Sequence, residues 1–223
     1  MNKGFRPIED AAIKHAGGKA ALEKRLPKPK SSEALRAVGD DRYLSMMSLR
    51  VFRAGLKHSL VDGRWPAFEE VFLGFEPRRV RAMSDEALEG LMADSRLIRH
   101  WGKIKATRDN AAAMCRVIEE QGSFGGYLAA WPGGRIVELW DDIAKRFSQM
   151  GGNSGPYFLR MAGKDTFLLT GDVVRALDHW RAFKGDPKAK KSRAAVQALF
   201  NDWSAETGRP LCQLSMILAL SVS

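Results

Sequence analysis

The stretch "MGGNSGPYFLRMAGK", residues 150–164, is the most informative part of the sequence about the fold. Its first half consists of small, turn-forming residues: Gly151, Gly152, Asn153, Ser154 and Gly155. The apolar pattern before it predicts a helix that ends near Phe147. A second helix should begin near Pro156, because proline suits the first turn of a helix. The stretch therefore predicts two helices joined by a tight hairpin at residues 150–156.

This hairpin has two interpretations. Glycine lets backbone N–H groups approach an anion closely, and the helix that follows adds its positive N-terminal end, so phosphate is a natural guest. The alternative is an ordinary turn between helices, ended by a glycine cap. Spacing alone leaves both open.

A second informative stretch, "LIRHWGKIKA", covers residues 97–106. It places Arg99, Lys103 and Lys105 beside Trp101 at the start of a long helix expected over residues 103–121. Such clustered cations are typical of contacts with a nucleic-acid backbone. Trp101 either stacks on a base or ribose or covers the core from the start of the helix.

The charge and composition agree with an anionic partner. The chain has 223 residues and a formal net charge of +10, which favours nucleic acid first and an anionic membrane surface second. Residues 1–30 and 184–193 are rich in cations and read equally well as solvated surface. The sequence shows no membrane-spanning run and no signal-peptide core, and its two cysteines form no disulfide framework. We expect a cytoplasmic, nucleoid-associated protein.

Helical periodicity dominates the chain. Residues 43–61 read as one helical stretch, Pro66 is expected to open a short helix, and residues 210–222 are apolar on nearly every side and should be buried. Only "DTFLL", residues 165–169, suggests a strand. The sequence predicts an all-α protein.

Two resemblances sharpen this expectation. The order of hairpin, helix and "GKDTFLLTGDVVRAL" (residues 163–177) resembles the helix-hairpin-helix DNA glycosylases. The first half is similar to the 3-methyladenine DNA glycosylase I family, with "AGLKH" at 54–58, "FEP" at 75–77 and "LIRHWGKIKATRDNA" at 97–111. Residues 40–180 carry the resemblance, and the "IRH.GKI" run is its most specific part.

The resemblance implies two helical lobes around a cleft, in a domain at 39–223 that follows a basic arm and helix at 1–38. It implies a monomeric base-excision-repair DNA glycosylase that needs no cofactor and hydrolyses the N-glycosidic bond of a damaged, alkylated purine in double-stranded DNA. The alternative is a damaged-DNA-binding protein of the same fold without the activity. A third reading, a membrane or RNA contact, leaves the hairpin unexplained.

The resemblance also implies roles for individual residues. The hairpin residues Gly151, Gly152, Asn153, Ser154 and Gly155, with Arg99, Lys103 and Lys105, would bind DNA. The family's aspartate near the start of the next helix aligns with Thr170 or, after a slip of two residues, with Asp172, which we take as the catalytic candidate. Thr170 and Asp172 are equally well explained as a helix cap and a first-turn acid.

The base pocket would include Arg50, His58, Trp101 and Thr170. Arg50 stands where the family has a glutamate, and His58 stands where it has a tryptophan. A guanidinium repels a cationic alkylated base, so we expect a changed pocket. The family's zinc ligands have no equivalents here, since Cys115 and Cys212 are not placed to replace them, and we expect no metal site.

Overall fold

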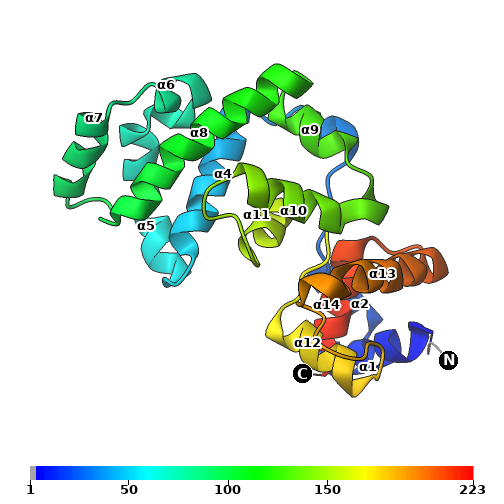
Figure 1. Cartoon of the computed structure of the whole chain (residues 1–223). Helices are drawn as coiled ribbons and strands as arrows, with labels where there is room; N and C mark the ends of the chain where they lie inside the picture. The colour runs from blue at the N-terminus through cyan, green and yellow to red at the C-terminus, as the bar shows by residue number, and fades with distance from the viewer. Residues whose placement is uncertain (1–3, 223) are drawn as a thin grey trace. The chain divides into compact units, whose positions relative to one another are not determined.

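The computed structural model describes residues 4–222, and within this range the protein is helical, without β-strands (Figure 1). The all-α class predicted from the sequence is confirmed. The residues 165–169 form no strand, because the described residues offer no second strand to pair with. Asp165 instead accepts hydrogen bonds from the backbone N–H groups of Leu211 and Cys212 at the start of the last helix. No helix in residues 4–222 has both the length and the apolar character that crossing a membrane requires.

The chain divides into two compact units. The first contains the chain up to Lys30, Pro132–Leu139 and the chain from Gly163 onward, and the second contains Ser31–Trp131 and Trp140–Ala162. Helix α10 (Ile136–Arg146) begins in a segment of the first unit and continues in the second.

The first unit is built around its last helix. Its helices are α1 (Arg6–Ala16), α2 (Lys19–Arg25), α12 (Gly171–His179), α13 (Arg193–Thr207) and α14 (Leu211–Leu220), with the 3-10 helices η3 (Gly133–Arg135) and η4 (Lys190–Ser192). Helix α14 packs against α1, α12 and α13. Leu214, Ile217 and Leu218 are fully buried, as the apolar sequence of this segment predicts.

The N-terminal helices belong to this first unit and are not a separate arm. Phe5, Ile8 and Ala12 are buried, and the Phe5 backbone N–H donates to the Glu206 carboxylate at 2.9 and 3.0 Å. The boundary that we predicted at residue 38 does not coincide with this division, since the chain up to Lys30 shares its core with α13 and α14.

The second unit is built around α8 (Trp101–Gln121). Around it lie α3 (Ser32–Arg36), α4 (Asp40–Arg53), α5 (His58–Val71), η1 (Leu73–Phe75), α6 (Pro77–Arg81), α7 (Asp85–Gly90), η2 (Leu91–Ala93), α9 (Phe124–Ala130) and α11 (Ser154–Ala162). Helix α8 packs against α4, α6 and α9 (Figure 1). Ile104, Ala111 and Met114 fill that contact with no exposed surface.

Two local features of the second unit differ from the sequence-based expectation. The stretch 43–61 is two helices, because α4 ends at Arg53 and Gly55 takes a positive φ of 76° before α5 begins at His58. Pro66 lies inside α5 and does not open a new helix. The short connection 54–57 exposes Leu56 and brings the end of α4 close to the start of α8.

Candidate functional site

The hairpin forms as predicted between α10 and α11. Phe147 and Met150 are buried, whereas Gly151, Gly152 and Asn153 are exposed. The turn is closed by two backbone hydrogen bonds of 3.1 Å, from the Ser154 N–H to the Gly151 carbonyl and from the Gly155 N–H to the Met150 carbonyl. Gly152 has a positive φ of 59°, which glycine adopts without strain. The hairpin therefore presents backbone at the surface.

Gly155 is needed for a different reason. A Cβ atom at this position would lie 3.1 Å from the Met150 carbonyl oxygen and 3.5 Å from a methyl group of Ile143. Glycine thus lets the first turn of α11 approach the turn that precedes it.

Helix α8 holds the hairpin through one buried amide. The Asn110 side chain donates to the Ser148 carbonyl at 3.1 Å and accepts from the Ser148 N–H at 2.6 Å. Gln149 adds a bond of 2.7 Å from its side-chain amide to the Gly102 carbonyl. Asn110 was not among the residues expected from the sequence, although it lies near the end of the "LIRHWGKIKATRDNA" run. The available signal was a polar residue on the buried face of a helix. The hairpin and the start of α8 consequently form one surface.

The residues at the start of α8 have different environments. Arg99 is exposed and makes no ion pair within residues 4–222. His100 caps the helix by accepting from the Lys103 N–H at 3.4 Å. Trp101 is 38% exposed, so its ring is accessible at the surface. Lys105 is exposed but pairs with Asp109 at 2.8 Å.

Lys103 does not lie at this surface. It is 7% exposed, and its Nζ donates to the carbonyls of Phe52 and Ala54 at 3.1 and 2.7 Å. These carbonyls end α4, where a cation is favourable. Burial, and then the nearby charge of Arg50, lower the pKa of Lys103. Its structural role replaces the phosphate contact that we predicted for it.

Arg50 is partly buried, with no acidic partner among the described residues. Its guanidinium carbon lies 4.9 Å from the centre of the Tyr157 ring, in a cation–π contact. Its Nε is buried and makes no hydrogen bond within residues 4–222, a situation that costs about 1–3 kcal/mol when no acceptor is supplied. Burial lowers the pKa of Arg50; Tyr157 opposes this shift and Arg53 adds to it. Tyr157 could not be recognised from the sequence, because only the fold brings it to Arg50.

The neighbouring Arg53 is different. It makes two hydrogen bonds of 2.8 and 2.7 Å to the Asp62 carboxylate. His58, the first residue of α5, is exposed. The second unit therefore contains the hairpin, Trp101, His58 and a partly buried cation, Arg50, for which the described chain supplies no counter-charge.

Thr170 and Asp172 belong to the first unit. The Thr170 hydroxyl caps α12 by accepting from the Val173 N–H at 3.2 Å. The Asp172 side chain is 56% exposed and pairs with Arg175 one turn later. The structure thus gives both residues the helix-terminal positions that one of our two interpretations described, and the catalytic role of Asp172 stays a prediction.

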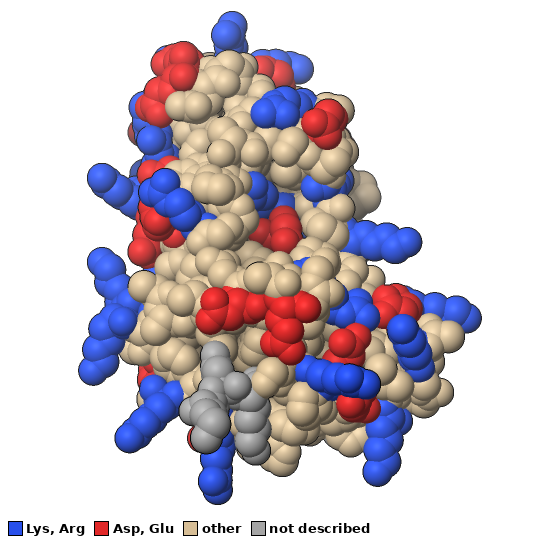
Figure 2. All heavy atoms as spheres, turned by 90° about the vertical axis from the view of Figure 1, so that its right-hand side faces the viewer, with Lys and Arg blue, Asp and Glu red and all other residues tan. Residues whose placement is uncertain are grey.

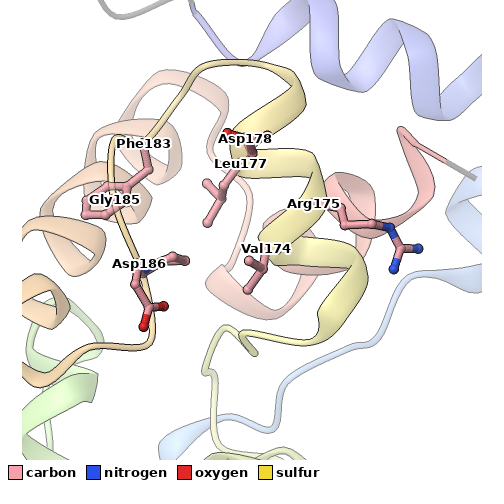
Figure 3. A pocket seen from close by; sticks show the side chains of 8 residues that line it. Val174, Arg175, Leu177, Asp178, Phe183, Gly185 and Asp186 are labelled. Atoms are coloured by element: carbon pink, nitrogen blue, oxygen red, sulfur yellow. The ribbon is translucent and has the colours of Figure 1, made fainter.

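A hollow of about 380 Å³ lies beside α12 in the same unit. Val174 and Leu177 project from the helix toward residues 183–187 (Figure 3). The lining includes the carboxylates of Asp178 and Asp186 and does not include Asp172. Arg175 also belongs to the lining, but its guanidinium points away from residues 183–187 (Figure 3). This hollow therefore suits neither a phosphate nor the predicted role of Asp172.

Charge is spread over the surface and interrupted. On the face that Figure 2 shows, Lys and Arg side chains project at many separate points, with Asp and Glu side chains between them. Segment 184–193 exposes Lys184, Lys188, Lys190 and Lys191. Within residues 4–222, no three or more His, Cys, Asp or Glu side chains gather in a way that could hold a metal ion.

Comparison with known proteins identifies the family of this chain. A family model described as methyladenine glycosylase matches residues 34–150, more than half of the chain. The chain belongs to the methyladenine glycosylase family. The part that matches this family contains Arg50, His58, Trp101 and Asn110, and it ends at the hairpin. Thr170 and Asp172 lie outside it.

Individual relatives of this member of the methyladenine glycosylase family are distant. DNA-3-methyladenine glycosylase 1 of Escherichia coli (strain K12) is 35% identical over 81 residues, which cover 36% of this chain and 43% of that protein. The match thus spans less than half of the curated relative.

Solved structures agree in fold. The 3-methyladenine DNA glycosylase I from Staphylococcus aureus matches with a TM-score of 0.52 and 19% identity, over 69% of this chain and 91% of that one. A point mutant of 3-methyladenine DNA glycosylase I, in complex with 3-methyladenine, matches with a TM-score of 0.51 and 19% identity, over 65% of this chain and 84% of that one. At this identity, the likeness shows a shared fold of the methyladenine glycosylase type and nothing finer.

Proposed function

We propose that the protein is a base-excision DNA glycosylase, which hydrolyses the N-glycosidic bond of a damaged, alkylated purine in double-stranded DNA. Membership of the methyladenine glycosylase family supports the class of reaction. The similar proteins named above are glycosylases of 3-methyladenine, which supports a purine lesion.

The observation that carries this proposal is the fixed hairpin. Its exposed glycine turn is joined to α8 by Asn110 and Gln149, close to the exposed Arg99 and the accessible Trp101. Backbone N–H groups and cations hold a DNA strand by its phosphates, and an aromatic side chain offers a surface for stacking. This combination suits an enzyme that takes a base out of the duplex.

The chemistry needs few groups. Water adds to the sugar carbon, the N-glycosidic bond breaks with its electron pair staying on the base, and the proton of the water ends on the base or in solvent. The sugar becomes positively charged as the bond breaks, so a carboxylate stabilises it. Asp172 is our candidate for that carboxylate.

The test is a base-release assay. Purified protein is incubated in excess over methylated duplex DNA, and free bases are separated from DNA and identified by mass. We expect release of alkylated purine that depends on protein concentration and leaves abasic sites. A folded protein that binds duplex DNA and releases no base from any damaged substrate would contradict the proposal.

That last outcome would favour a second function, a damaged-DNA-binding protein without activity. Two observations favour this second function. Asp172 is exposed and paired with Arg175, and Thr170 caps a helix. Tighter binding of damaged than of undamaged duplex, without base release, would identify it.

A further inference from the structure

The second unit holds three basic side chains around the end of α4, and their partners differ. Arg53 is neutralised by two hydrogen bonds to Asp62. Lys103 is satisfied by the carbonyls of Phe52 and Ala54. Within residues 4–222, Arg50 has neither a carboxylate nor a carbonyl partner, and its Nε is buried without a hydrogen bond.

The charged groups that act on Arg50 are themselves positive. Arg53 and Lys103 are the ionised groups that interact with it in the described chain, and Tyr157 provides an aromatic face. A guanidinium remains protonated in proteins, so burial here keeps a donor-rich cation in place and does not neutralise it. Such a group favours a ligand that accepts hydrogen bonds and carries no positive charge, and it repels a cationic ring.

We propose that Arg50 is a specificity-determining residue that selects neutral purine lesions with hydrogen-bond acceptors, such as hypoxanthine and ethenoadenine, over cationic N-alkylated purines. This inference rests on the glycosylase function proposed above and shifts its substrate class from cationic alkylated purines to neutral damaged purines.

The charge of the departing base also indicates that Arg50 assists the release of neutral lesions. A cationic base becomes neutral when it takes the electron pair of the broken bond, and it needs no help from a cation. A neutral base leaves as an anion until it takes up a proton. The charge of Arg50 stabilises that anion, and its N–H groups donate to the acceptor atoms of the ring.

The experiment compares lesions and variants under single turnover. Duplexes of one sequence carry hypoxanthine or ethenoadenine, and methylated DNA supplies cationic 3-methyladenine. Arg50→Gln keeps donors but removes the charge, and Arg50→Met removes both at similar length. Arg53→Gln is the matched control, because it removes an arginine already paired with Asp62 from the same helix. Melting curves establish that each variant is folded.

We expect the unmodified protein to accelerate release of a neutral lesion, relative to its spontaneous release, more than it accelerates release of 3-methyladenine. Arg50→Gln and Arg50→Met should slow release of the neutral lesion by about tenfold or more, the loss typical of a charged hydrogen bond, and should not slow release of 3-methyladenine. Arg53→Gln should keep the original ratio. A larger acceleration of 3-methyladenine release than of neutral-lesion release over the spontaneous rates, or equal effects of Arg50→Gln on both classes, would overturn the inference and leave the proposed function standing.

Calorimetry with the bases alone, without DNA, tests the selectivity of Arg50 separately from the glycosylase activity. The bases are used in their N9-methylated forms, because a substituent on N9 keeps the positive charge that 3-methyladenine carries in DNA. 9-Methylhypoxanthine should bind the unmodified protein more tightly than the cationic 3,9-dimethyladenine, and Arg50→Gln should remove that preference. If this pattern appears but no DNA substrate releases a base, the glycosylase function fails while the selectivity of Arg50 holds. If no preference appears, the selectivity fails whatever the release assay shows.

Discussion

At the scale of single residues, Gly152 offers a clean test of the hairpin. No atom lies within 4 Å of a Cβ built at this position, and its φ is 59°. Asn and Asp tolerate this left-handed conformation better than other residues with a side chain, so the variants Gly152→Asn and Gly152→Asp differ mainly in charge. The aspartate should weaken duplex binding about tenfold relative to the asparagine, because it places a negative charge near a phosphate.

Fluorescence anisotropy with two duplexes of unrelated sequence, at two salt concentrations, measures this effect. The loss should be the same for both sequences, because phosphate contacts carry no sequence information. Equal affinities of the two folded variants would exclude the hairpin from DNA binding.

Asp172 gives a second test at this scale. Asp172→Asn keeps the size of the side chain and removes its charge, and loss of a preorganised electrostatic partner typically slows a reaction about 100-fold or more. Single-turnover base release should fall accordingly, while duplex affinity is retained. The control is Asp178→Asn, which removes another exposed acid from α12. If both variants release base at the original rate, the catalytic carboxylate lies elsewhere.

At the scale of elements, Asn110 connects α8 to the hairpin. Asn110→Ala removes two hydrogen bonds that a buried side chain makes to Ser148, and losing both should lower the free energy of unfolding by about 1–3 kcal/mol. Amide hydrogen exchange at Ser148 should become faster. The exposed Asn153→Ala should change stability by no more than about 0.5 kcal/mol. Urea denaturation compares the two, and equal stabilities would show that the amide does not hold the hairpin.

A hydrogen bond between α4 and α3 is made by a tyrosine hydroxyl, which titrates at high pH. The fully buried Tyr43 hydroxyl donates to the Leu35 carbonyl at 2.7 Å, and burial raises the pKa of Tyr43 to about 12. The unfolded chain therefore loses this proton at lower pH than the folded protein does. The contribution of Tyr43 to stability should be complete at pH 8 and should decline as pH rises from about 10 toward 12.

Tyr43→Phe provides the comparison. It should be less stable than the original protein at pH 8, by about 1 kcal/mol, because it loses one hydrogen bond. The difference should shrink or reverse at pH 11. A constant difference between urea denaturation curves at the two pH values would contradict the assigned shift.

At the scale of the whole molecule, we expect stability without a metal. The chain has only two cysteines, which are buried in different units, and residues 4–222 contain no group of three potential ligands. Purified protein should carry no stoichiometric zinc, and chelators should leave its melting temperature unchanged. One tightly held zinc ion per chain, with a melting temperature that falls on chelation, would contradict this expectation.

The sequence predicts what depends on neighbouring residues. The hairpin, the long helix α8 and the buried α14 follow from glycine, proline and apolar periodicity, which act locally. The break at Gly55, the burial of Lys103 and the contact of Arg50 with Tyr157 depend on segments that meet only in the fold. For that reason the cations near residue 100 looked equivalent in the sequence, whereas the structure separates an exposed Arg99 from a buried Lys103.

The division of the first unit into separated segments has a consequence for biosynthesis. Helix α1 leaves the ribosome long before α14, against which it packs, is translated. The second unit is complete once residue 162 has emerged and can fold while synthesis continues. Until α13 and α14 have been synthesised, the apolar side chains that they cover in the folded protein stay exposed to water and accessible to molecular chaperones. These side chains include Phe5, Ile8 and Leu22.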